Sequence, residues 1–125
     1  SSDVCSSDLA VIEAYKSLEE AAMGHKGKEW RSYAADEIAL ASSNGDKMFD
    51  KETRAVAIEK AAMGGVAPTK LLTALLLDFG ITVVMRSKHQ PDKGDLLQIT
   101  RVWVKRDGRW QETLSYQTGI KTPSK

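Results

Sequence analysis

The clearest pattern in the first half of the chain is an apolar stripe at helical spacing between residues 10 and 23. Polar residues, among them Glu13, Lys16 and Glu20, separate its members, and Gly24 follows as a common helix stop. A stripe of this kind predicts an amphipathic helix that buries one side. Its apolar members are Val11, Ile12, Tyr15, Leu18 and Ala22.

Weaker signals follow this stripe. Residues 28–34 predict a short second helix with Trp30 on its apolar side, and residues 36–43 predict a strand from a brief alternation of apolar and polar positions. Asp50 is a typical N-cap residue, so we expect it to begin a third helix that ends near residue 63. Helices therefore dominate the first half of the chain.

The second half of the chain has the composition of strands. Residues 81–85 are rich in β-branched side chains, and residues 89–95 contain the proline and glycine of a loop. Residues 96–106 and 109–118 then flank Asp107-Gly108, which is a strong hairpin signal. Helices first and antiparallel strands afterwards predict an α+β domain.

Composition narrows the class of protein. A chain of 125 residues with 42% apolar and 28% charged residues fits one globular domain. Its net charge of +1 argues against nucleic acid as a partner, because proteins that bind nucleic acid usually concentrate basic charge. The longest apolar stretch, residues 74–77, is far shorter than the ~18 residues of a membrane span. We expect neither a nucleic acid nor a membrane as partner.

The first nine residues are similar to the translation of a sequencing adaptor, typical of a metagenomic reading frame, which predicts a non-native leader that is disordered or makes no core contacts. The alternative is a genuine leader whose Asp8 caps the first helix. On the first interpretation Cys5, the only cysteine, is not native, and the chain has no thiol chemistry of its own. The native N-terminus would then be missing, and the protein would be cytoplasmic or, with a lost signal peptide, exported.

Three segments resemble the nuclear transport factor 2-like superfamily, in its SnoaL-like branch. They are residues 33–38, residues 79–84 and, most specifically, residues 101–110. The resemblance implies a bacterial domain over residues 10–120, followed by a tail at 121–125. It also implies N-terminal helices packed in a strongly curved antiparallel sheet, which forms a cone around an apolar pocket, and a homodimer that packs through sheet faces.

Residues 70–78 show a conflict between local pattern and resemblance. Their leucines lie at helical spacing, and leucine favours helices. The resemblance instead implies a sheet strand here, which would require strand pairing to outweigh that local preference. We expect the strand.

The hairpin, taken as a regular ladder, divides its side chains between two faces. The more aromatic face carries Trp103, Leu114 and Tyr116, with Arg101 and Glu112 as its charges, and is predicted to pack on a second copy of the chain. The other face suits a pocket wall. A β-bulge would exchange the faces, and both could also be ordinary sheet surfaces. With the helices, the second face predicts a ligand pocket formed by Tyr15, Trp30, Thr100, Val102, Ser115 and Gln117.

Catalytic residues cannot be assigned from this resemblance. Isomerases of the superfamily use a carboxylate base and hydrogen-bond donors beside a bound carbonyl compound. The position of the base corresponds here to residues 40–43, which contain no acid, and a second acid position corresponds to Thr100. Only Tyr15 matches a tyrosine of that site. His25 and His89 both lie in predicted loops, where a solvated imidazole is the default expectation.

The sequence thus predicts a small-molecule-binding or scaffold domain, a non-catalytic homodimer with an apolar pocket that binds a small hydrophobic molecule. No motif indicates a metal or a cofactor. The alternative is a cofactor-free lyase, isomerase or cyclase that acts on a hydrophobic carbonyl compound. A third possibility is an interaction module with a filled cone. An empty cavity with an inward carboxylate would favour the enzyme.

Overall fold

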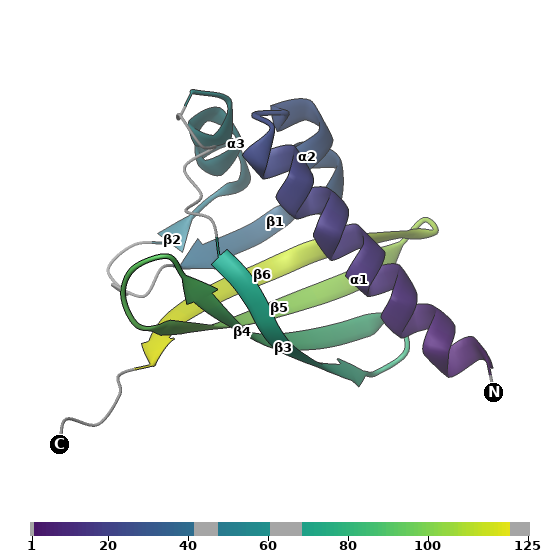
Figure 1. The fold of residues 1–125 in the computed structure, drawn as a ribbon. Coiled ribbons are helices and arrows are strands. Elements are labelled where there is room, and N and C mark those ends of the chain that lie inside the picture. Colours follow the sequence, from purple (N-terminus) through teal and green to yellow (C-terminus); the bar gives the residue numbers. More distant parts are fainter. Residues whose placement is uncertain (1, 42–47, 61–68, 121–125) are drawn as a thin grey trace, which may run out of the picture.

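The computed structural model describes residues 2–41, 48–60 and 69–120, as a mixed sheet with three helices (Figure 1). The predicted end of the third helix near residue 63 and the tail at 121–125 lie outside the described residues. In chain order the elements are α1 (Ser2–Met23), α2 (Gly27–Tyr33), β1 (Ala34–Ala41), β2 (Met48–Phe49), α3 (Lys51–Lys60), β3 (Thr69–Asp78), β4 (Thr82–Pro91), β5 (Leu96–Arg106) and β6 (Arg109–Ile120).

The strands form one sheet in the order β2-β1-β6-β5-β4-β3. Helix α1 crosses one face of this sheet, and α2 and α3 lie together near one end of α1 (Figure 1). The α+β class is confirmed, but the expectation of a purely antiparallel sheet is wrong, because β1 runs parallel to β6. The two strands are far apart in the sequence, and no local pattern determines their relative direction.

The predicted stripe of α1 forms the centre of the core. Val11, Tyr15 and Leu18 are buried there, and the sheet contributes Met85 and Trp103, both with no exposed surface. Burial of a large apolar side chain stabilises the folded state by about 1.5–3 kcal/mol. The long first helix is therefore held by its contacts with the sheet as much as by its own helix propensity.

Helix α1 begins at Ser2, so the backbone of residues 2–9 is helical and not disordered. The other form of the expectation, that residues 1–9 make no core contacts, stays a prediction. Asp8 lies inside the helix and does not cap it. An existing helix extends at little cost, and this explains how the segment joins α1. Leu9 is 64% exposed, and the buried core begins at Val11. The non-native origin of the leader stays a prediction.

Two local signals in the sequence are confirmed. The carboxylate of Asp50 accepts a hydrogen bond from the backbone N–H of Thr53, at 2.8 Å, as an N-cap does before α3. Asp107 and Gly108 have φ angles of 52° and 78°, and Arg106 pairs with Arg109 across the turn. Two consecutive residues with positive φ are typical of the tight hairpin turn predicted there.

The strand predicted for residues 70–78 is confirmed as β3, which lies at the edge of the sheet. It pairs with β4 from Thr69 to Asp78, and this long ladder outweighs the helical preference of its leucines. Nearly all its side chains are exposed, including Leu75 at 54%.

A bulge in β6 determines which side chains face the helices. Trp103 pairs with Glu112, whereas the preceding Val102 pairs with Leu114, so the register passes over Thr113. Side chains beyond the bulge therefore change faces relative to a regular ladder. The inner face then carries Ile99, Arg101, Trp103, Trp110, Glu112, Ser115 and Gln117, and the outer face carries Thr100, Val102, Val104, Leu114 and Tyr116.

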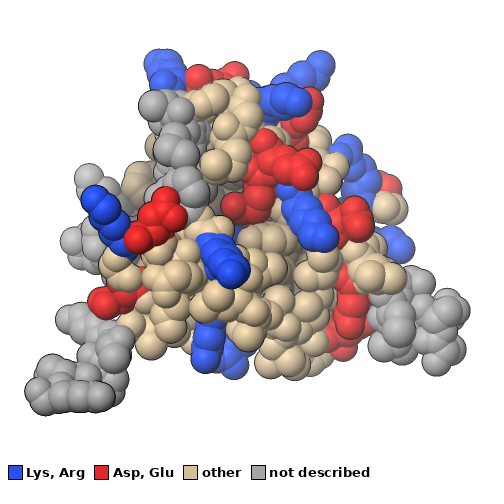
Figure 2. Space-filling view, in the orientation of Figure 1, with Lys and Arg blue, Asp and Glu red and all other residues tan. Residues whose placement is uncertain are grey.

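Charges of both signs are interspersed over the surface seen in Figure 2. Some of them form exposed ion pairs, such as Arg31 with Glu52 at 3.0 Å and Arg106 with Glu37. Exposed pairs of this kind contribute little to stability, about 0–1 kcal/mol each. Among the described residues, no helix has the length and hydropathy needed to cross a membrane.

Candidate functional site

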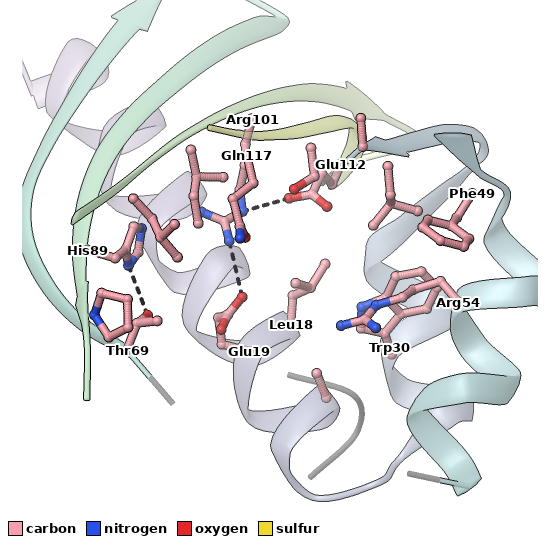
Figure 3. Close-up of a pocket in the computed structure, with 17 residues that line it drawn as sticks. Leu18, Glu19, Trp30, Phe49, Arg54, Thr69, His89, Arg101, Glu112 and Gln117 are labelled. Carbon is pink, nitrogen blue, oxygen red and sulfur yellow. Dashed lines mark hydrogen bonds and ion pairs between the residues drawn. The ribbon is translucent and has the colours of Figure 1, made fainter. Parts of the chain in front are cut away.

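A cavity of about 350 Å³ lies between α1, the helices α2 and α3, and the inner face of the sheet (Figure 3). One part of its wall is apolar, formed by side chains such as Leu18, Trp30 and Phe49. The rest of the wall is polar and contains Glu19, Arg54, Thr69, His89, Arg101, Glu112, Ser115 and Gln117. An apolar wall with a few converging polar groups is the usual composition of a small-molecule site.

Arg101 is the centre of the polar wall. It extends from β5 and is only 5% exposed. Its Nε lies 3.1 Å from Oε2 of Glu112 on β6, and its Nη2 donates to Oε1 of Glu19 on α1 at 3.2 Å (Figure 3). Its guanidinium carbon also lies 4.7 Å from the centre of the Tyr15 ring, a cation–π contact. Arg101 thus joins the sheet to α1 through charge and stacking together.

One atom of this cluster has unused hydrogen-bonding capacity. Nη1 of Arg101 is buried and makes no hydrogen bond within the described part of the chain. Nε of Arg101 and Oε2 of Glu112 instead face one another at 3.1 Å, as an ion pair. Most buried polar atoms in folded proteins are hydrogen-bonded, so Nη1 indicates a site that can receive a further partner.

Burial governs the charge state of Glu112, which is 1% exposed. The pKa of its carboxyl is raised to about 7, because removal from water and the nearby charge of Glu19 raise it more than Arg101 lowers it. The protonation of Glu112 therefore changes near neutral pH. Perturbed acids of this kind cluster at functional sites.

His89 forms the other end of the polar wall. Its Nε2 lies 2.7 Å from the hydroxyl oxygen of Ser87, and its Nδ1 lies 3.3 Å from that of Thr69. Burial, together with the positive charge of Arg101, lowers the pKa of His89 to about 4. The imidazole is consequently neutral at physiological pH, with both ring nitrogens engaged.

The predicted pocket residues divide into three groups. Trp30, Ser115 and Gln117 line the cavity. Tyr15 is buried beneath the Arg101 guanidinium, next to the cavity wall but not part of it. The remaining two assignments are wrong. Arg101 lines the cavity, so its neighbours Thr100 and Val102 lie on the outer face of β5, away from the cavity.

The predicted dimer face also needs correction. Trp103 has no exposed surface and belongs to the core, whereas Leu114 and Tyr116 lie on the outer face. The three residues therefore do not share one face. A regular ladder places them together, and the bulge at Thr113 separates them.

Three polar cavity residues were not assigned to a site from the sequence. Arg101 and Glu112 fell on the predicted outer face, although they line the cavity. His89 was expected in a solvated loop but is 1% exposed, because β4 extends to Pro91. Along β4 the buried positions alternate with exposed ones and include Ser87 and His89. In the sequence, the alternation of Ser87 and His89 with the charged Arg86 and Lys88 was the available signal that His89 belongs to the strand.

Comparison with solved structures finds the same fold over most of the chain. An NTF2-like protein from Cytophaga hutchinsonii superposes with a TM-score of 0.73 at 18% identity, covering 88% of this chain and 95% of that one. A protein with unknown function from the DUF3225 family of Pectobacterium atrosepticum gives 0.74 at 12% identity and 90% coverage of both chains. An NTF2-like protein with a cystatin-like fold from Novosphingobium aromaticivorans gives 0.76 at 11%, covering 98% of this chain and 87% of that one.

No protein-family profile and no curated protein matches the sequence significantly. The identities to the solved structures are low, so the likeness bears on architecture and leaves chemistry open. The narrower SnoaL-like placement stays a prediction. The helices, the sheet order and the structural neighbours agree with the superfamily resemblance seen in the sequence: the chain has the nuclear transport factor 2-like, cystatin-like fold.

Proposed function

We propose that this domain binds a small organic molecule in the cavity between α1 and the inner face of the sheet. The observation that carries the proposal is the pairing of an apolar wall with an unpartnered polar atom, Nη1 of Arg101, in a space of about 350 Å³. Pockets for small molecules commonly measure about 300–1,000 Å³ and have this mixed lining. Trp30 from the apolar side and Arg101 from the polar side would contact the same ligand.

The energetics of the polar wall favour a ligand over a filled, purely architectural cone. A buried polar atom without a partner costs about 1–3 kcal/mol. Nη1 of Arg101 carries this cost in the free protein. A bound molecule with a suitable oxygen would recover it, whereas apolar packing of the cavity would not.

The test is to fill the cavity with a larger side chain and to measure which small molecules co-purify with each variant. Ser115 lines the cavity, and Leu114 beside it lies on the outer face. We expect native mass spectrometry to find a small molecule on the wild-type protein and on Leu114→Phe. We expect occupancy to fall at least about tenfold in Ser115→Phe, because losing a few contacts worth about 1.4 kcal/mol has that effect. Equal occupancy in the two variants would place the ligand elsewhere and refute the proposal.

A second candidate function is proton transfer by a cofactor-free lyase, isomerase or cyclase. The observation that favours it is Glu112, an inward carboxylate whose pKa is raised by burial to about 7. Its carboxylate would remove a proton beside a carbonyl group, and Arg101 would donate to the developing enolate oxygen. Glu112→Gln should then lower turnover of the identified ligand by about 10²–10⁴-fold. An unchanged rate would exclude Glu112 as the base.

We also propose that the working form is a homodimer packed through the outer face of the sheet. Leu77, Val84, Val102 and Leu114 form one apolar row across four strands. In the next row Leu75 and Tyr116 stand at the two ends, with Arg86 and Thr100 between them. The side chains of Leu75, Leu77 and Tyr116 are 54%, 40% and 43% exposed. Large exposed apolar patches mark interaction surfaces, and we expect this row to be the centre of one.

Sedimentation tests the dimer. Val102→Arg places a charge in the middle of the apolar row and should convert the dimer into a monomer, because an unpaired buried charge is costly in an interface. Glu20→Arg, on the exposed side of α1, is the matched control and should leave the dimer intact. A monomeric wild type, or a dimeric Val102→Arg, would contradict the proposed face.

A further inference from the structure

The polar end of the cavity has a charge balance that depends on one proton. Arg101 from β5 and Arg54 from α3 carry positive charge, Glu19 from α1 carries negative charge, and His89 from β4 is neutral. Tyr15 from α1 is also neutral, because burial raises the pKa of its hydroxyl. Protonation of Glu112 removes one negative charge from this end of the cavity and makes it more favourable for an anion.

The donors at this end also depend on that proton. Nη1 of Arg101 offers N–H groups that no described acceptor uses. The carboxyl of Glu112, whose Oε2 lies 3.1 Å from Arg101 Nε, becomes an O–H donor when it is protonated. The guanidinium N–H groups of Arg101 and the O–H of a protonated Glu112 can each donate a hydrogen bond to an oxygen of a ligand carboxylate. An ammonium group would instead meet Arg101 as a like charge.

We infer that the cavity takes a small monocarboxylate, with its carboxylate against Arg101 and a protonated Glu112 and its apolar part toward Leu18 and Trp30. This inference rests on the proposed binding function and names its ligand class. Binding adds one negative charge and draws one proton from solvent onto Glu112 wherever that carboxyl was ionised.

The sign of the pH dependence follows from Glu112. Its pKa in the free protein is about 7, and the ligand binds the protonated form. Affinity is therefore full below about pH 7 and falls by about tenfold for each pH unit above it, while proton uptake approaches about one per ligand. A neutral ligand has no reason to show either effect.

Calorimetric titration with phenylacetate, phenylacetamide and phenethylamine tests the inference on the full chain. At about pH 6 we expect phenylacetate to bind at least about tenfold more tightly than the amide and the amine, since a charge-assisted hydrogen bond is worth more than a neutral one. Titrations in two buffers of different ionisation enthalpy measure the proton uptake. The affinity of phenylacetate should fall between about pH 7 and about pH 9 in the wild type.

Glu112→Gln is the variant that isolates the proton. Glutamine keeps the shape and a donor but cannot ionise, so phenylacetate should bind with no pH dependence and no proton uptake. Arg101→Gln should lose the preference for the carboxylate over the amide, and Lys105→Gln at the exposed end of β5 should keep it.

The outcomes separate this inference from the proposed function. Equal or tighter binding of the amide, with no proton uptake, would overturn the carboxylate class and leave the cavity as a binding site. Failure of phenylacetate to bind at millimolar concentration would overturn it as well. The co-purification experiment with Ser115→Phe then decides independently whether the cavity binds any ligand.

Discussion

Replacement of Arg101 by methionine should destabilise the protein by about 3–5 kcal/mol, the usual cost of removing one partner from a buried ion pair. The variant leaves Glu112 buried without its nearest positive charge, 3.1 Å away in the native protein. Its pKa should rise further, because Arg101 is the main influence that lowers it. The destabilisation should therefore be largest above pH 7 and smaller at about pH 5, where a protonated Glu112 needs no counter-charge.

Urea denaturation at the two pH values measures this effect. Arg106→Met is the matched control, since Arg106 forms an exposed pair with Glu37 that should be worth less than about 1 kcal/mol. Adding Glu112→Gln to Arg101→Met should restore part of the lost stability above pH 7, because no buried charge remains. Equal losses for Arg101→Met and Arg106→Met would show that the Arg101 cluster is solvated.

Trp103→Ala should lower the free energy of unfolding by about 3–5 kcal/mol, the usual cost of truncating a buried aromatic side chain. Trp103 has no exposed surface and packs in the core beneath α1. Tyr116→Ala is the control from the outer face, where the side chain is 43% exposed, and it should change monomer stability by less than about 1 kcal/mol.

The same pair of variants tests the orientation of the sheet. If Trp103→Ala kept its stability and merely dissociated into monomers, Trp103 would be an interface residue, as a regular hairpin ladder predicts. The bulge at Thr113 would then be absent in solution. Thermal denaturation and sedimentation of the two variants distinguish these cases.

Local signals in the sequence predicted the fold well. The stripe from Val11 to Ala22, the cap at Asp50 and the turn at Asp107-Gly108 each depend on residues close together in the chain. The strand at Thr69–Asp78 was predicted from the resemblance, against its helical leucine spacing. In that segment the hydrogen-bonded pairing with β4 outweighs the helix propensity of the leucines, and this pairing cannot be read from the local sequence.

The candidate site was harder to predict, because one residue without a partner in the ladder, Thr113, decides which side chains of β6 face the cavity. Nothing about Thr113 marks a bulge in the sequence, yet the bulge leaves Leu114 and Tyr116 on the outer face while Trp103 and Glu112 lie on the inner face. The inward position of Glu112 likewise follows from packing against α1 and not from its own neighbours. The parallel pairing of β1 with β6 also joins distant segments.

Glu112 is the central residue of the proposed site, as a buried acid that contacts the ligand in the cavity. A ¹³C NMR titration of its side-chain carboxyl, in the free protein and with saturating phenylacetate, tests this directly. We predict that the Glu112 carboxyl titrates with a midpoint at about 7 in the free protein, and that this midpoint moves upward when phenylacetate binds. A midpoint at the ordinary glutamate value of 4.5, unchanged by phenylacetate, would contradict both the burial of Glu112 and its role in binding.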